Sequence, residues 1–228
     1  IHGDGFNYLT KMCLLVMREA AFRMAKHGRD HGCFVTVNSS DSSDRPEEYL
    51  HNGCDAVVLG EGEETLRELV DGMGDDGTVP VSLPGTVMRV EGAVRSNGRR
   101  PVMRDLDSLP LPAWDLVDIA PYRSIWTASQ GYFSLNVATT RGCPFKCNWC
   151  AKPIYGNRYN SRSPEHVVRE LELLKAGSQV EHIWFCDDIF GLKPGWVQAF
   201  RDAVRHGAPG LRFKIQSRAD LLLEGDTL

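Results

Sequence analysis

Residues 133–150 read Phe-Ser-Leu-Asn-Val-Ala-Thr-Thr-Arg-Gly-Cys-Pro-Phe-Lys-Cys-Asn-Trp-Cys. The first part, residues 133–139, is typical of a β-strand, and the last part carries Cys143, Cys147 and Cys150 in a Cys-x3-Cys-x2-Cys spacing. Three thiolates this close in sequence are expected to converge on one soft metal centre. The stretch therefore predicts a strand followed directly by a metal-binding loop.

The kind of metal centre follows from the number of thiolates. Three protein ligands leave a [4Fe–4S] cluster with one iron open, and that iron can bind a cofactor or substrate through nitrogen and oxygen donors. A zinc site is the alternative, but it needs a fourth ligand, and zinc sites usually combine two pairs of Cys or His. No second cysteine pair occurs in the sequence, which favours the cluster over zinc.

The residues after the cysteines alternate between helix and strand patterns. Ser163 is a good N-cap for a helix, and Pro164 fits its first position. Residues 182–186 and 211–216 have the pattern of strands, and residues 194–206 between them have apolar side chains at helical spacing. The order β-α-β-α-β predicts half of a β/α barrel or a small parallel sheet.

The residues before the cysteines also alternate. Apolar spacing predicts a helix over residues 10–27, and short apolar runs predict buried strands over residues 33–37 and 55–59. A parallel sheet binds ligands beyond the carboxyl ends of its strands. Here those ends lead into Ser39–Asp44 and Gly60–Glu63, which are therefore candidate binding segments.

Residues 71–130 contain turn and linker signals. Residues 86–98 alternate around a turn and predict a hairpin. Prolines at positions 101, 110, 112 and 121 predict a semi-rigid linker, which we place over residues 101–130.

The sequence resembles the radical S-adenosylmethionine (SAM) enzymes. The resemblance rests on Cys143, Cys147 and Cys150, with the aromatic Trp149 just before the last of them, in the loop after the first strand of the second region. It implies that the cysteines hold a [4Fe–4S] cluster whose open iron chelates SAM. One electron from the reduced cluster would then cleave SAM to a 5′-deoxyadenosyl radical. The cofactors would perform the difficult chemical steps, and the protein would exclude water and orient the reactants.

The resemblance also implies which side chains contact SAM. Asp187 or Asp188 would hold its amino group. The alternative is that the two residues are an N-cap pair that precedes a helix near Pro194. Arg218 follows the third strand and would meet the carboxylate or ribose, unless it is an ordinary surface residue. Trp149 would pack beside the adenine, with a place in the core as the alternative.

The first region resembles the cobalamin-binding, flavodoxin-like domain that precedes the radical SAM barrel in one subgroup. The segments that carry the resemblance are residues 7–12, 33–44 and 55–66, followed by the linker motif at residues 105–115. An ordinary set of Rossmann-like turns is the alternative. The Asp-x-His-x-x-Gly motif that supplies a cobalt ligand in some cobalamin proteins does not occur here. The residues that would approach cobalamin are Asn7, Tyr8, Ser39, Ser40, Asp41, Ser42, Gly60, Glu61 and Gly62.

The predicted fold class is α/β. Residues 1–100 are expected to form part of a flavodoxin-like or Rossmann-like cobalamin-binding domain that ends in the hairpin. Residues 101–130 would form the linker, and residues 131–228 the first half of a radical SAM partial barrel. The chain begins with Ile1 rather than Met and ends at Leu228, so we expect a piece of a longer protein.

The resemblance implies methyl transfer to an unactivated carbon, with cobalamin as methyl carrier. Radical cyclisation or rearrangement, as in a porphyrin-ring cyclase, is an alternative within the same subgroup. A non-catalytic zinc-binding module that contacts other proteins is the alternative from another class. The enzyme would act on a small molecule and would need a one-electron reductant such as ferredoxin or flavodoxin.

Composition excludes several other classes. The chain has 228 residues, of which 42% are hydrophobic and 25% charged, as in an ordinary globular protein. A formal net charge of -4 gives no sign of general nucleic-acid binding, and no apolar run is long enough to span a membrane. Seven cysteines, an odd number, argue against a disulfide framework and for a reducing compartment, the cytoplasm.

Overall fold

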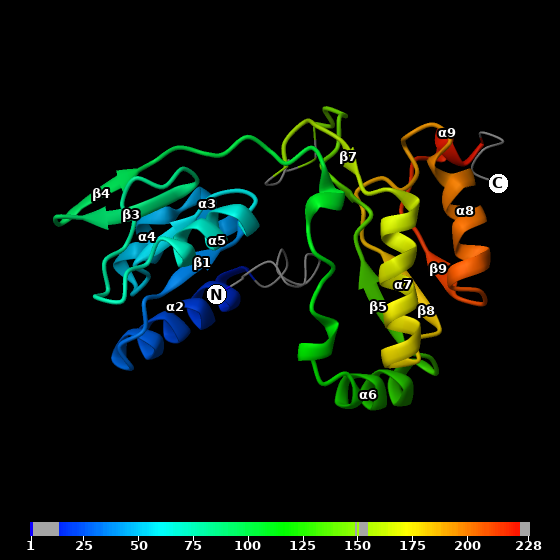
Figure 1. Ribbon diagram of the computed structural model, residues 1–228, viewed down its shortest axis with the longest axis horizontal. Coiled ribbons are helices and arrows are strands. Elements are labelled where there is room, and N and C mark those ends of the chain that lie inside the picture. The colour runs from blue at the N-terminus through cyan, green and yellow to red at the C-terminus, as the bar shows by residue number, and fades with distance from the viewer. Residues whose placement is uncertain (2–13, 149, 151–154, 224–228) are drawn as a thin grey trace. The chain divides into compact units, whose positions relative to one another are not determined.

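The computed structural model describes residue 1, residues 14–148, residue 150 and residues 155–223. The chain divides into two compact units, an N-terminal unit that ends at Val102 and a C-terminal unit that begins at Met103 (Figure 1). Each unit has its own sheet and its own hydrophobic core. None of the helices in the described ranges combines the length and apolar character needed to cross a bilayer.

The N-terminal unit contains a mixed sheet of four strands in the order β1-β2-β3-β4. Strand β1 (Thr36–Asn38) pairs in parallel with β2 (Ala56–Val58), as the two apolar runs predicted. The hairpin predicted over residues 86–98 is confirmed as β3 (Thr86–Val90) and β4 (Ala93–Ser96). It extends the sheet, because β3 pairs antiparallel with β2.

Helices cover both faces of this sheet. They are α2 (Leu14–Asp30), α3 (Ser40–Asp44), α4 (Pro46–His51) and α5 (Glu63–Asp71). Val57 packs with Ala25 and Leu50 on one face, and its neighbour Ala56 packs with Leu69 on the other. This follows from the alternation of side chains along a strand.

The buried face of helix α5 differs from the one that the sequence pattern predicts. The helical spacing of apolar residues predicts that Leu66, Leu69 and Val70 face inward, but only Leu69 is buried, whereas Leu66 is 45% and Val70 58% exposed. Thr65, which is fully buried, takes the place that the apolar spacing gave to its neighbours.

The C-terminal unit contains a parallel sheet in the order β5-β8-β9. The strands are β5 (Ser134–Val137), β8 (His182–Phe185) and β9 (Arg212–Lys214), and the crossover helices are α7 (Pro164–Ser178) and α8 (Trp196–Gly207). A short helix, α9 (Ala219–Leu222), follows β9. The predicted order β-α-β-α-β is confirmed, with Ser163 as N-cap and Pro164 in the first turn of α7.

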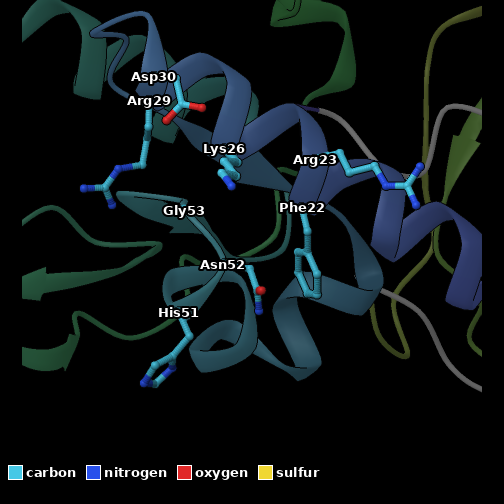
Figure 2. A pocket seen from close by; sticks show the side chains of 8 residues that line it. All are labelled: Phe22, Arg23, Lys26, Arg29, Asp30, His51, Asn52 and Gly53. Carbon is cyan, nitrogen blue, oxygen red and sulfur yellow. The ribbon is translucent and has the colours of Figure 1, made fainter.

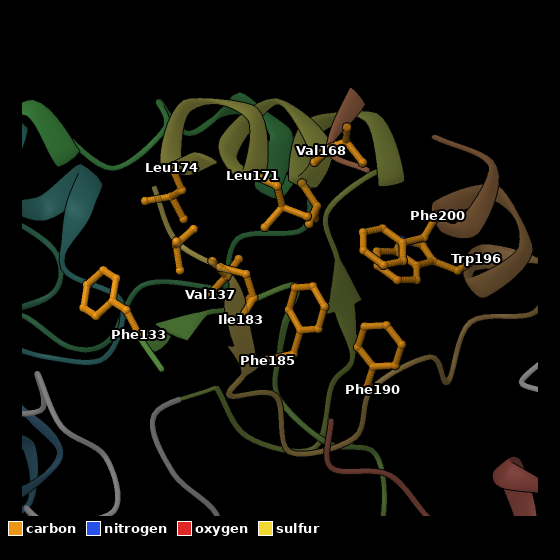
Figure 3. Close-up of a cluster of buried hydrophobic side chains, with 13 residues drawn as sticks. Phe133, Val137, Val168, Leu171, Leu174, Ile183, Phe185, Phe190, Trp196 and Phe200 are labelled. Carbon is orange, nitrogen blue, oxygen red and sulfur yellow. The ribbon is translucent and has the colours of Figure 1, made fainter. Parts of the chain in front are cut away.

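One face of this sheet packs against α7 and α8 (Figure 3). Ile183 and Phe185 of β8 are fully buried, as is Leu171 of α7. The Phe185 ring stacks on Phe190 and Phe213, with ring centroids 5.1 Å and 5.3 Å apart. Aromatic pairs of this kind add to the free energy gained from burial alone.

Polar and aromatic side chains alternate onto the opposite face of the same strands. Ser134 Oγ lies 2.8 Å from His182 Nδ1, and Lys214 Nζ lies 4.3 Å from the centre of the Trp184 indole ring. The two faces of the sheet therefore differ in character, as expected when only one of them packs against helices.

Residues 103–130, where a linker was expected, belong to the C-terminal unit. They form the 3-10 helices η1 (Leu106–Ser108) and η2 (Trp114–Leu116) and the helix α6 (Ala120–Gln130). Trp114 Nε1 donates to Glu170 Oε1 over 3.0 Å, and the backbone N–H of Ser163 donates to Asp107 Oδ1 over 2.9 Å. The prolines limit regular structure here, but these side chains fasten the segment to α7.

Candidate functional site

The candidate metal-binding cysteines lie in a loop closed by a small ribbon. After β5 the chain forms β6 (Thr140–Arg141), which pairs antiparallel with β7 (Asn160–Ser161). Cys143, Cys147 and Cys150 lie between these two strands, and all three are free and partly exposed. The loop therefore starts from the carboxyl end of the first parallel strand, where ligand sites of α/β sheets form.

The thiols are gathered in one loop, but they do not form a ready-made metal site. Among the described residues, no three His, Cys, Asp or Glu side chains are grouped so that they could hold a metal ion. The donor set itself fits a soft metal, because thiolates are the ligands that iron–sulfur clusters and zinc prefer.

Arg218 lies over this loop. Its guanidinium carbon is 4.0 Å from the centre of the Phe145 ring, and Phe145 lies between Cys143 and Cys147. A hydrogen bond to Asp220 raises the pKa of Arg218, and the sulfurs of Cys147 and Cys143 raise it further. The structure thus brings together the cysteines and a predicted SAM-binding residue that is far from them in sequence.

Asp187 and Asp188 occupy opposite environments after β8. Asp187 is 2% exposed, and its Oδ1 accepts hydrogen bonds from the backbone N–H groups of Thr139 and Thr140 over 2.7 Å and 2.9 Å. Its Oδ2 accepts a hydrogen bond from Thr139 Oγ1 over 2.5 Å. Burial raises the pKa of Asp187, and these hydrogen bonds oppose the rise. Asp188 is exposed, so it is the carboxylate of the pair that is open to a ligand.

In the N-terminal unit, the two candidate cobalamin-binding segments lie next to each other. Asn38 Nδ2 donates to the carbonyl oxygens of Val58 and Gly60 over 3.1 Å and 3.0 Å, which joins the ends of β1 and β2. A Cβ atom at Gly62 would come within 3.2 Å of the Asn38 amide. A side chain at position 62 would therefore crowd the Asn38 amide that joins these segments.

The segment after β1 is more ordered than the predicted loop. Ser39 is the N-cap of α3, and its Oγ accepts a hydrogen bond from the backbone N–H of Ser42 over 2.9 Å. Ser39 and Ser42 are both buried, whereas Ser40 is partly exposed. Gly60, Glu61 and Gly62 are also partly exposed.

Asp41 is buried in an ion pair with Arg18. The Arg18 guanidinium donates to both carboxylate oxygens over 2.6 Å and 2.7 Å, and the Tyr49 hydroxyl donates to Oδ2 over 2.8 Å. Burial alone would raise the pKa of Asp41, but the hydrogen bonds from Arg18 and Tyr49 outweigh it and lower the pKa. Both oxygens of Asp41 thus tie α3 to α2 and α4.

This ion pair predicts how the N-terminal unit responds to acid. Because its folded-state pKa is lowered, the Asp41 carboxylate stabilises the unit above its unfolded-state pKa of about 3.9, and this contribution is lost as the pH falls through the folded-state value. We expect Asp41→Asn to speed amide hydrogen exchange in β1 and β2 at pH 6 and to have a smaller effect near pH 3. Asp44→Asn, an exposed change in the same helix, should leave exchange unchanged. Equal effects of the Asp41→Asn change at both pH values would contradict the assignment.

A hollow of 440 Å³ on the N-terminal unit lies away from these segments (Figure 2). It is lined by Arg23, Lys26 and Arg29 of α2 and by Asn52 and Gly53, which precede β2. Residues before a parallel strand lie at its amino end, so the hollow is at the edge opposite to the candidate cobalamin-binding segments. We assign it no part in the candidate site.

The remaining cysteines, Cys13, Cys33, Cys54 and Cys186, have no partner at a ligand spacing, so the sequence predicts that they are core thiols. Cys54 is buried, as expected, and burial raises its pKa to about 11. Cys33 and Cys186 are exposed, which corrects the expectation that both are core residues. Cys13 was also expected to be a core thiol. It lies outside the described residues, as do the predicted ligand-binding residues Asn7, Tyr8 and Trp149.

Residues 137–225 match the model of the Radical SAM superfamily. The match starts in β5 and includes the cysteine loop, Asp187, Asp188 and Arg218. Residues 137–225 form a radical SAM domain. The match confirms the predicted resemblance to the radical SAM enzymes over most of the C-terminal unit.

Relatives and solved structures agree with this assignment. An uncharacterized methyltransferase from Pyrococcus horikoshii is 36% identical over 177 residues, which cover 75% of this chain and 37% of the relative. An anaerobic magnesium-protoporphyrin IX monomethyl ester cyclase from Rubrivivax gelatinosus is 32% identical over 124 residues, which cover 53% of this chain and 21% of the relative. The chain therefore spans well under half the length of these relatives.

A solved structure has a fold similar to that of most of the chain. The cobalamin-dependent SAM radical enzyme OxsB, in a structure with aqua-cobalamin bound, superimposes with a TM-score of 0.71 at 21% identity. The superposition covers 95% of this chain and 30% of OxsB. The predicted α/β fold class is thus confirmed beyond the radical SAM domain.

Proposed function

We propose that the full-length protein is a cobalamin-dependent radical SAM enzyme that transfers a methyl group to an unactivated carbon. The observation that carries the proposal is the loop of Cys143, Cys147 and Cys150 at the carboxyl end of β5, with Arg218 above it. The name of the Pyrococcus relative, a methyltransferase, supports the proposed reaction.

The cofactor-binding residues are assigned from donor chemistry and exposure. The three thiols would hold a [4Fe–4S] cluster, and Asp188 and Arg218 would bind the amino and carboxylate groups of SAM by opposite charge. The partly exposed Ser40, Gly60, Glu61 and Gly62 would line the cobalamin site.

When bound, the cluster supplies the electron that cleaves SAM to a 5′-deoxyadenosyl radical, and cobalamin supplies the methyl group. The chain's own contribution is to bind, orient and exclude water. The cysteine loop follows β5, and Asp188 follows β8. Because β5 and β8 are parallel neighbours, the loop and Asp188 start from the same edge of the sheet. Orientation of this kind can lower the barrier of a reaction between bound partners by several kcal/mol, about 7–11 in favourable cases.

The proposal includes a compartment and a redox partner. All the cysteines that the structure describes are free thiols, which fits a reducing compartment such as the cytoplasm. A one-electron donor such as ferredoxin or flavodoxin would reduce the cluster. The substrate would be a small molecule.

Radical cyclisation is the second candidate for the reaction. The identity to the Rubrivivax cyclase favours it, because that relative is named for ring closure rather than for methyl transfer. The two reactions would use the same cysteine loop, so the products distinguish them.

The test uses the full-length protein, reconstituted anaerobically and mixed with SAM and a chemical reductant. We expect formation of 5′-deoxyadenosine, and co-elution of a corrin spectrum with the protein after hydroxocobalamin is added. With a candidate small-molecule substrate added, methylated product together with S-adenosylhomocysteine would support methyl transfer, and an unmethylated ring-closed product would support cyclisation. Absence of SAM cleavage from a protein that holds stoichiometric zinc would overturn the proposal in favour of a zinc-binding module.

A further inference from the structure

Asp187 is a buried carboxylate that contacts the chain where it enters the cysteine loop. Its side chain is almost fully buried, and it accepts three hydrogen bonds, from the backbone N–H groups of Thr139 and Thr140 and from Thr139 Oγ1. The donors lie forty-seven and forty-eight residues away in sequence, so the contact joins the end of β8 to the chain that leaves β5.

These bonds hold the chain at the point where it enters the cysteine loop. Thr140 is the first residue of β6, and Cys143 follows shortly after it. From another side, Arg162 holds the same stretch, because its backbone N–H donates to the Thr139 carbonyl over 2.9 Å. Its guanidinium donates to the Ala138 carbonyl, also over 2.9 Å. The stretch from 138 to 140 is therefore fixed by polar contacts from two directions.

We propose that Asp187 is a positioning residue that fixes the entry of the cysteine loop, so that Cys143 can reach the same metal centre as Cys147 and Cys150. This inference rests on the proposed function. It gives Asp187 and Asp188 different tasks, with Asp187 acting through the backbone of Thr139 and Thr140 and Asp188 facing the ligand.

The chemistry of the three bonds makes the role testable with a conservative variant. In Asp187→Asn, Oδ1 can still accept from both backbone N–H groups, and the new side-chain NH2 can donate to Thr139 Oγ1, which accepts as readily as it donates. In Asp187→Ala all three bonds are lost, and two buried N–H groups are left without a partner. A positioning role therefore predicts that Asn preserves function and Ala does not.

The experiment measures metal content and the electron paramagnetic resonance (EPR) spectrum of the reduced full-length protein, with and without SAM. We expect Asp187→Ala to lower the fraction of chains that hold a cluster by about fivefold or more at limiting iron, since a buried donor left without a partner shifts an equilibrium by about that factor or more. Asp187→Asn should match the wild type in cluster content and in its spectral response to SAM. Asp188→Asn should keep the cluster and weaken the response to SAM.

A further variant covers the case in which Asp187→Ala does not fold. Valine has nearly the same shape as threonine, so Thr139→Val removes only the hydrogen bond from Oγ1. We expect this variant to fold and to hold a cluster in a smaller fraction of chains than the wild type. Wild-type cluster content in both Asp187→Ala and Thr139→Val would overturn the proposal. It would also be overturned if Asp187→Asn kept the cluster but no longer responded to SAM, because the carboxylate charge would then act on the ligand.

Failure of the proposed function has a different signature. If the wild type holds zinc instead of an iron–sulfur cluster, the proposed enzyme activity is wrong. The same variants then test positioning through zinc retention, with Asp187→Asn expected to keep zinc and Asp187→Ala to lose it.

Discussion

Cys147→Ala is expected to lower the iron content of the reconstituted full-length protein from about four irons per chain to almost none. Cys147 is the middle cysteine of the loop, and a cluster held by only three thiolates has no protein ligand to spare. The loss should appear in both iron and acid-labile sulfide, together with the disappearance of the visible absorption of the cluster.

Cys33→Ala is the matched control for this experiment. Cys33 is an exposed thiol outside the radical SAM domain, so its removal should leave the iron and sulfide contents unchanged. Equal losses in Cys33→Ala and Cys147→Ala would point to general instability, and unchanged iron in Cys147→Ala would show that the loop is not the metal site.

Glu170→Ala is expected to lower the free energy of unfolding of the C-terminal unit by about 3–5 kcal/mol. Glu170 is 2% exposed, and its Oε2 lies 2.5 Å from Arg162 Nη1. Its Oε1 accepts the hydrogen bond from Trp114. Removal of the carboxylate leaves a buried guanidinium without its counter-charge, and such a charge costs more than the pair contributes. It also releases the segment that contains Trp114 from α7.

Urea unfolding followed by tryptophan fluorescence measures this effect. The chain's tryptophans, all of which come after Val102, are Trp114, Trp126, Trp149, Trp184 and Trp196. Their signal therefore reports on the C-terminal unit. Glu172→Ala changes an exposed carboxylate in the same helix and should stay within about 0.5 kcal/mol of the wild type. If the two variants were equally stable, the buried ion pair would not hold this unit together.

The parts of the fold that are local in sequence could be predicted. The β-α-β-α-β order follows from apolar spacing and from the cap at Ser163, because both signals act within a few residues. The hairpin β3–β4 could be located for the same reason. Its pairing with β2 could not, since nothing in residues 86–98 specifies a partner strand.

In the candidate site, too, the features that are local in sequence could be predicted and those that depend on distant residues could not. The cysteine spacing is a local signal and places the loop directly after β5. Asp187 and Asp188 are adjacent, and sequence alone could not decide which one faces inward. That depends on Thr139 and Thr140, which are distant in sequence and carry no signal of their own.

The buried pair of Arg162 and Glu170 is a second contact that the sequence did not reveal. Two opposite charges eight residues apart look like an ordinary exposed helix surface. They become buried because Trp114, which lies in the expected linker, packs on α7 and brings the chain over them. Tertiary contacts of this kind cannot be read from periodicity.

The proposed enzyme requires that Cys143, Cys147 and Cys150 together hold a [4Fe–4S] cluster. Metal and sulfide analysis of the anaerobically reconstituted full-length protein tests it most directly. We expect about four irons and four sulfides per chain, all lost when the three cysteines are replaced together by Ala. Stoichiometric zinc without iron or sulfide would contradict it.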